Sequence, residues 1–60
     1  MKLGTLLKQI PIRQGVTLVE RGNVIATGHS EYVDVVAHKD KTVGMIEAEG
    51  NRIIINVYDR

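Results

Sequence analysis

The first ten residues place their apolar side chains with the period of an α-helix. Leu3, Leu6, Leu7 and Ile10 stand at positions i, i+3, i+4 and i+7, so they share one helical face. Pro11 then disfavours the α conformation at the residue before it. We therefore predict a short helix over residues 2–10. Because a helix of about two turns is not stable alone, its apolar face must pack on the rest of the chain.

From Val16 onward the apolar positions recur with a period of two, which is typical of β-strands. Two pairs of segments rich in β-forming residues flank a Gly-Asn dipeptide. They are residues 16–21 and 24–27 around Gly22-Asn23, and residues 43–49 and 52–58 around Gly50-Asn51. Glycine supplies the positive φ that a tight hairpin turn requires. The pattern predicts two β-hairpins.

The second hairpin separates its residues clearly between two faces. One face is apolar and carries Gly44, Ile46, Ala48, Ile53, Ile55 and Val57. The other carries Met45, Glu47, Glu49, Arg52, Ile54 and Asn56. This alternation suits an antiparallel sheet that is covered on one side, with Glu47 or Glu49 placed to pair with Arg52.

In the first hairpin, a two-residue loop leaves both faces half apolar. A three-residue loop would reverse the parity of one strand. The interpretation favoured here is that the second face is buried against another subunit.

Residues 30–37 fit either a strand or a helix. The alternation of Val33 and Val35 and the content of β-formers favour a strand. In the alternative, Ser30 caps a helical turn whose inward side chains are Tyr32, Val33, Val36 and Ala37. A polar loop, residues 38–41, follows in either case.

Together these elements predict an α+β fold in a single small domain, residues 1–60. Its helix, residues 2–10, packs on a twisted antiparallel sheet of four to five strands within residues 16–58. The alternative is a small β-barrel, because a short helix followed by up to five short strands resembles Sm-like RNA-binding proteins. Their Asp-x-x-Met-Asn and Arg-Gly-Asn segments are absent here, and Glu49-Gly50-Asn51 is the nearest approach to the second.

Composition adds an expectation about assembly. The chain has 60 residues, 43% of them hydrophobic, and no cysteine, so it has neither disulfides nor a thiolate metal site. A core of this size is small for a chain without such cross-links. We therefore expect a homo-oligomer, with a two-fold dimer favoured. No signal peptide or membrane-spanning segment is recognisable, so a cytoplasmic protein is expected.

No pattern in the sequence indicates catalysis. The glycines are spaced singly at turn positions and do not form a phosphate-binding loop. His29, Ser30 and Glu31 are consecutive, and neighbours along a strand point to opposite faces, so they cannot form a catalytic relay. The histidines and carboxylates match no metal-site spacing. We expect a protein that is not an enzyme and that has no cofactor and no metal.

The candidate functional residues are therefore binding residues. An exposed tyrosine beside charged groups suits a binding hot spot, which points to Tyr32, His38, Lys39 and Lys41 as partner contacts. In the alternative, Tyr32 closes the core beneath its own loop. Arg13 and His29, with His38 and Lys39, would contact an anionic ligand if they met at a subunit interface.

Nucleic acid is a less favoured partner. Residues 1–15 carry three cations and no acid, whereas typical DNA-binding proteins neutralise roughly 6–10 phosphates. The chain has two tyrosines and no Phe or Trp, so it also has few aromatic groups on which bases would stack.

Three segments carry a resemblance to a known group of proteins. They are Leu3–Ile10, the pattern Val-x-Leu-x-x-x-Gly-Asn-x-Ile-x-x-Gly over Val16–Gly28, and Val43–Val57. With them the chain resembles short accessory proteins of phages and mobile elements of Gram-positive bacteria, in which the middle is often a short helical turn. The resemblance implies an accessory protein with no catalytic residues to transfer.

From the resemblance and the residues we expect a binding module that inhibits or modulates a host defence or replication protein by occlusion. The alternatives are a small nucleic-acid-binding protein and an oligomeric sponge for an anionic small ligand such as a nucleotide.

Overall fold

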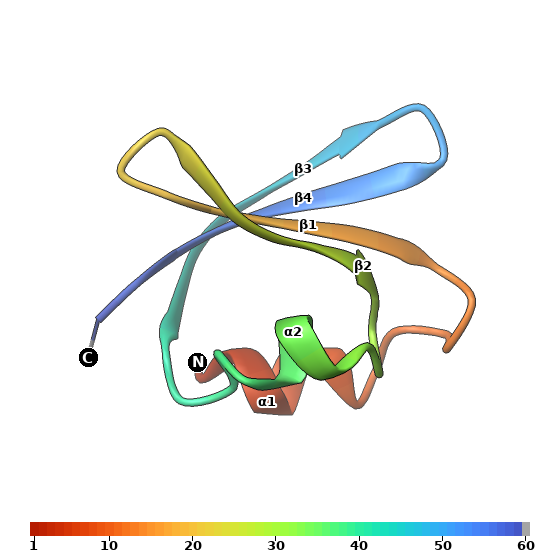
Figure 1. The fold of residues 1–60 in the computed structure, drawn as a ribbon, viewed down its shortest axis with the longest axis horizontal. Helices are drawn as coiled ribbons and strands as arrows, with labels where there is room; N and C mark the ends of the chain where they lie inside the picture. The colour runs from red at the N-terminus through yellow and green to blue at the C-terminus, as the bar shows by residue number, and fades with distance from the viewer. Residues whose placement is uncertain (60) are drawn as a thin grey trace.

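The structure, a computed structural model, describes residues 1–59 and contains two short helices and four strands. The elements are α1 (Leu3–Leu7), β1 (Gly15–Glu20), β2 (Asn23–His29), α2 (Val33–Val36), β3 (Thr42–Glu49) and β4 (Arg52–Tyr58). The strands form one sheet in the order β2-β1-β4-β3, and both helices lie on the same side of it (Figure 1). The predicted α+β class is confirmed.

The sheet is mixed, so the prediction of an antiparallel sheet is wrong. Each hairpin is antiparallel, but the two hairpins join through β1 and β4, which run parallel. The reason is the connection through α2, which carries the chain beneath the sheet from the β2 edge to the β3 edge (Figure 1). Because β2 and β3 are both edges of this four-stranded sheet, the alternative of a closed Sm-like barrel is also wrong.

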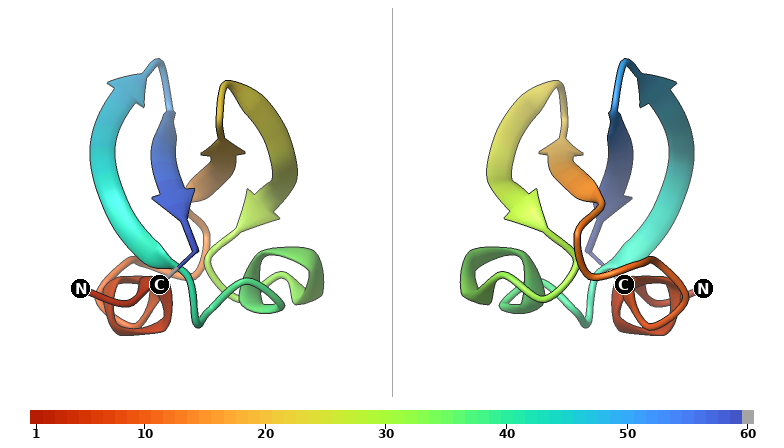
Figure 2. Two further views of the ribbon diagram at one scale, coloured as in Figure 1. Left: turned by 90° about the vertical axis from the view of Figure 1, so that its left-hand side faces the viewer. Right: turned by 90° about the vertical axis from the view of Figure 1, so that its right-hand side faces the viewer.

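The core lies between the sheet and the two helices, which sit side by side beneath it (Figure 2). Its fully enclosed side chains come from α1, β1, α2 and β4, and they are Leu3, Val16, Leu18, Val35 and Ile55. Register places Val16 beside Ile53 and Leu18 beside Ile55, so the parallel central pair forms the sheet side of the core. We call this side of the sheet the inner face and the opposite, uncovered side the outer face.

The first hairpin turns one residue earlier than predicted. Glu20 pairs with Asn23, so the turn residues are Arg21 and Gly22, with φ angles of 55° and 82°. Two positive φ angles are typical of a type I′ turn. Asn23 is the first residue of β2 and not part of the turn.

A β-bulge resolves the ambiguous faces of this hairpin. Leu18 pairs with Ala26, whereas Val19 pairs with Val24, which leaves Ile25 as an extra residue in β2. Ile25 therefore packs against the core beside Ala26 instead of alternating away from it. The parity changes within the strand, so the faces drawn from an unbroken two-residue hairpin are wrong, and the loop does not have three residues.

The second hairpin matches its prediction over most of its length. Glu49 pairs with Arg52 around Gly50-Asn51, and Ile46 and Ala48 face the same side as Ile55 and Ile53. Gly44 is the exception, because a bulge between Val43 and Ile46 turns it toward Tyr58 on the outer face. The turn of this hairpin projects away from the helices (Figure 1), and Ile46 is 51% exposed.

The preferred strand over residues 30–37 is wrong, because Val33–Val36 form the helical turn α2. Its backbone is closed by bonds from the Val36 N–H to the Tyr32 carbonyl and from the Ala37 N–H to the Val33 carbonyl, at 2.9 and 3.0 Å. The inward side chain is Val35, while Val33 is 71% exposed, so the predicted inward set also fails. The need to cross beneath the core overrides the β-propensity of valine.

The N-terminal helix is confirmed and is shorter than residues 2–10. It spans Leu3–Leu7 and continues as a turn, with the N–H groups of Gln9 and Ile10 bonding to the carbonyls of Leu6 and Leu7. Leu3 and Leu7 are buried, as the helical pattern predicted. No helix within residues 1–59 has the length and apolar character that crossing a membrane requires.

Candidate functional site

A groove lies between the two helices. It has a volume of about 310 Å³. Its lining residues come from α1 and its C-cap, from the segment that follows β2, and from α2 with its following loop: Gly4, Leu7, Lys8, Ser30, Glu31, Val36 and Lys39. We call it the interhelical groove.

Backbone hydrogen bonds fix α1 against the loop that follows α2. The N–H of Leu3 donates to the carbonyl of Lys41, and the N–H of Gly4 donates to that of Lys39, both at 2.8 Å. Gly4 allows this approach, because a Cβ at its position would lie 3.2 Å from the Cβ of Lys39. The two walls of the groove are therefore held at a set distance by backbone groups.

Ser30 fixes one end of the groove. Its side chain is buried, and its hydroxyl lies within hydrogen-bond distance of the carbonyls of Ile10 and Pro11, at 3.3 and 3.2 Å. These contacts tie the residue that follows β2 to the chain that follows α1. Ser30 thus serves the packing of the two connections and does not cap α2, which begins with no side-chain cap.

The α2 turn presents apolar side chains to solvent beside the groove. Because Val35 takes the inward position, Tyr32, Val33 and Val36 are 40%, 71% and 37% exposed. The Tyr32 ring lies over Gly28, where a Cβ would be 2.6 Å from the ring. We call Tyr32, Val33 and Val36 the α2 patch, and Val36 joins this patch to the groove.

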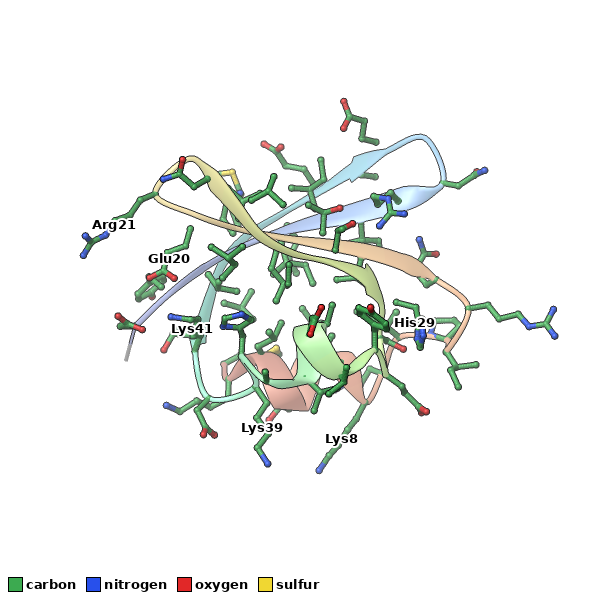
Figure 3. The ribbon with its side chains drawn as sticks, viewed as in Figure 1. Lys8, Glu20, Arg21, His29, Lys39 and Lys41 are labelled. Atoms are coloured by element: carbon green, nitrogen blue, oxygen red, sulfur yellow. The ribbon has the colours of Figure 1, made fainter. Side chains whose placement is uncertain are left out.

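Charged side chains surround the apolar surface unevenly. Lys8 and Lys39 extend from the bottom of the molecule, away from the sheet (Figure 3). Glu31 is the one carboxylate among the lining residues, so the groove itself carries a formal charge of +1. An apolar floor with two ammonium groups at its rim suits an apolar group that is followed by acidic ones.

Two of the four predicted partner contacts lie at this surface. Lys39 lines the interhelical groove, and Tyr32 belongs to the α2 patch. His38 follows α2 and is half-buried. Its backbone N–H donates to the Val35 carbonyl at 3.1 Å.

Lys41 is held elsewhere, by two carboxylates. Its Nζ lies 2.6 Å from an Asp59 oxygen and 3.0 Å from a Glu20 oxygen. The hydrogen bond to Asp59, followed by that to Glu20, raises the pKa of Lys41 above its ordinary value, and the same bond lowers the pKa of Asp59. We therefore leave Lys41 out of the binding surface.

The predicted anion contacts do not meet in this groove. His29 packs near Tyr32, with ring centroids 5.6 Å apart, and its Nδ1 accepts a hydrogen bond from the N–H of Glu31. Arg13 lies in the loop before β1, beside Asn51 and Arg52. Within the single chain, Lys39 and Arg13 thus line different hollows.

The sequence reasoning missed Val33 and Val36 as surface residues and did not assign Lys8 to the site. The helical pattern over residues 2–10 already placed Lys8 opposite the apolar stripe. The valines were missed because their exposure follows from α2 being a helix that points Val35 inward.

Comparisons with known proteins do not assign a function to the site. No family model, no curated protein and no solved structure matches the chain. Within residues 1–59 the structure forms no group of three or more His, Asp or Glu side chains placed to hold a metal ion.

Proposed function

We propose that this protein is a non-catalytic binding module that docks on a partner protein through the interhelical groove and the α2 patch. The observation that carries the proposal is the exposure of three large apolar side chains on α2 and its N-cap residue, next to an apolar groove. Contiguous apolar surface of this kind, rimmed by charge, is typical of protein-interaction sites.

The partner segment that fits is amphipathic and acidic. An apolar side chain would enter the groove between Leu7 and Val36. Acidic groups beside it would meet Lys8 and Lys39, which point into solvent at the rim (Figure 3). A tyrosine at the edge of the surface supplies the large, rigid contact area that is enriched in binding hot spots.

The mode of action we propose is occlusion. When this protein is bound to its partner through the groove, it would act by covering a surface that the partner needs. The resemblance to accessory proteins of phages and mobile elements suggests a host defence or replication protein as that partner. A second copy of this chain is the competing occupant of the same surface.

The test compares two exposed valines. Val33→Asp adds a charge to the α2 patch, and Val24→Asp adds the same charge to β2, where Val24 is 64% exposed. Both substitutions are at the surface and should leave folding intact, which the midpoint of thermal unfolding checks. Wild-type, Val33→Asp, Val24→Asp and Lys39→Glu proteins are immobilised in parallel and incubated with a bacterial lysate.

We expect the wild-type and Val24→Asp proteins to retain a stoichiometric partner from the lysate, and the Val33→Asp and Lys39→Glu proteins to lose it. A partner retained equally by all four proteins would show that the surface is wrong. Sedimentation velocity of the same variants identifies self-association. A dimer that Val33→Asp dissociates, with no other protein retained, would replace the partner by a second copy.

A further inference from the structure

Arg52 adopts a conformation that the cross-strand charge pattern does not explain. It stands opposite Glu49 in the β3–β4 pair, yet its side chain reaches across β1 toward β2. Within residues 1–59, the ion pairs are those of Lys41 with Glu20 and Asp59. The expected pairing of Arg52 with Glu47 or Glu49 is therefore not made, and its charge is not neutralised by a carboxylate.

One nitrogen of the guanidinium holds the side chain in place. Nη1 lies 3.1 and 3.3 Å from the carbonyl oxygens of Val16 and Gly28, to which it donates. It also lies 3.0 and 3.4 Å from the hydroxyl oxygens of Thr27 and Thr17. A guanidinium has five N–H donors. Nε and Nη2 contact no protein acceptor within residues 1–59, so three donors remain for a ligand.

Gly15 provides the flat surface on which this group rests. A Cβ at Gly15 would lie 3.2 Å from the Arg52 Cζ and 3.4 Å from Nη2. A Cβ at position 15 would therefore crowd the guanidinium, which would have to shift by a few tenths of an ångström. The guanidinium of Arg52 is held by two backbone carbonyls and rests where residue 15 has no side chain. It is therefore preorganised and not freely mobile.

A hollow of about 550 Å³ opens beside this guanidinium. It is lined by Arg13, Gly15, Glu49, Asn51 and Arg52. The Gln14 side chain joins its two walls, because Nε2 donates to the carbonyl of Asn51 at 2.6 Å and to that of Gly15 at 3.1 Å. The loop that carries Arg13 is thus tied to the β3–β4 turn. We call this feature the arginine hollow.

The charges of the arginine hollow select a class of ligand. Two guanidinium groups and one carboxylate give a formal charge of +1, which matches an anion of charge −1. A tetrahedral phosphate offers oxygens to two guanidiniums that come from different elements. A planar carboxylate, by contrast, presents two oxygens that a single guanidinium binds through two parallel hydrogen bonds.

We propose that the arginine hollow binds the phosphate group of a small ligand, with a singly charged phosphodiester favoured. Arg52 supplies the preorganised donors, Arg13 the second positive charge, and Glu49 discriminates against more highly charged anions. This site lies apart from the interhelical groove and does not depend on the function proposed for it. Its place beside Arg13 agrees with the expectation of an anion contact at that residue.

The test is an NMR titration of ¹⁵N-labelled protein at constant ionic strength, because added salt alone screens surface charges. The probes are dimethyl phosphate, inorganic phosphate and acetate. We expect saturable shifts of the Gly15, Asn51 and Arg52 amides with dimethyl phosphate, and weaker binding of the other two probes. Shifts that rise linearly without saturation, or that spread equally over all basic residues, would overturn the proposal.

Matched variants separate the geometry from the charge. Arg52→Lys keeps the charge and loses the fork, and Gly15→Val keeps every charge and crowds the guanidinium out of its position over residue 15. Each should weaken dimethyl phosphate binding at least fivefold. Glu49→Gln should strengthen binding of inorganic phosphate. Arg21→Ala removes an exposed arginine at the far end of the molecule (Figure 3) and should leave the affinity unchanged.

The controls keep the two proposals distinguishable. Val33→Asp should titrate like wild type, so loss of partner binding and loss of phosphate binding are independent results. If Arg52→Lys or Gly15→Val fails to give a folded spectrum, Arg13→Ala replaces it, because that side chain is exposed in a loop. Unchanged affinity in every folded variant of the arginine hollow would contradict the site.

Discussion

The two hairpins share a Gly-Asn dipeptide and differ in how they use it. In the β1–β2 hairpin the turn is Arg21-Gly22, and both residues have positive φ. In the β3–β4 hairpin the turn is Gly50-Asn51, and Gly50 has a φ of 62°. A glycine therefore marks where a chain reverses, while the pairing of the flanking residues decides which neighbour shares the turn.

The hairpins also differ in how far their inner faces are covered. Leu18 of β1 is completely buried, whereas Ile46 of β3 faces the same side and is half exposed. The helices lie beneath one part of the sheet, and the end of the β3–β4 hairpin extends beyond them (Figure 1). Alternation along a strand thus reports the side of the sheet, and only the packed helices determine burial.

The largest expected effect tests this difference in coverage. Leu18→Ala removes a fully enclosed side chain and should lower the free energy of unfolding by about 3 kcal/mol. Ile46→Ala removes a half-exposed side chain and should cost about 1 kcal/mol or less. Urea unfolding of both variants measures the two values. Equal losses would mean that Ile46 is covered in solution, as a dimer through β3 would require.

A smaller effect tests the two turns. Arg21 has a φ of 55°, which costs a residue with a side chain about 1–2 kcal/mol relative to glycine. Arg21→Gly should therefore raise the free energy of unfolding, by about 0.5 kcal/mol once the added flexibility of the unfolded chain is subtracted. Asn51 lacks a positive φ, so Asn51→Gly should be destabilising. Thermal unfolding distinguishes these signs, and the same sign in both variants would contradict the assignment of the turns.

The smallest effect concerns the ion pairs of Lys41, which lie at the opposite end of the sheet from Gly50. The pKa of Asp59 is lowered from its ordinary value of 3.8 by the bond to Lys41, so this contribution to stability is present above pH 3.8 and is lost as the pH falls through the lowered pKa. The pKa of Lys41 is raised from 10.5, so the stability it contributes is present below pH 10.5 and is lost as the pH rises through the raised pKa.

We therefore expect Asp59→Asn to flatten the loss of stability below pH 4, measured by the midpoint of urea unfolding at a series of pH values. The effect should be slight, because Asp59 is exposed and water screens the pair. Glu47→Gln is the matched control, since Glu47 lies on β3 and forms no ion pair with the other described residues. Identical pH profiles for Asp59→Asn and wild type would exclude this linkage.

The elements of this fold that depend on local residue patterns could be predicted from the sequence, and those that depend on distant contacts could not. Alternation found both hairpins, and the helical stripe found Leu3 and Leu7 as core residues. The bulge at Ile25 and the parallel β1–β4 pair were missed, because register and strand order depend on packing between segments far apart in the chain. The strand predicted over residues 30–37 failed for the same reason.

The candidate sites show the same division. Tyr32, Lys39 and Arg13, which the sequence analysis named as candidates from their residue types, lie at the two proposed surfaces. The role proposed for Arg52 was missed, because pairing across adjacent strands predicts a contact with Glu49. The structure instead carries its side chain over Gly15, a path that depends on the strand order β2-β1-β4.

The parallel pairing of β1 with β4 has a consequence for how the protein is made. During synthesis, β1 leaves the ribosome before its central partner β4, which follows only after 31 further residues, from position 21 to position 51, have been added. Until then the nascent β1–β2 hairpin has an open edge and an unfilled hydrophobic side. Folding should therefore complete late and all at once, and an interruption of translation before β4 should yield a chain that chaperones or proteases recognise.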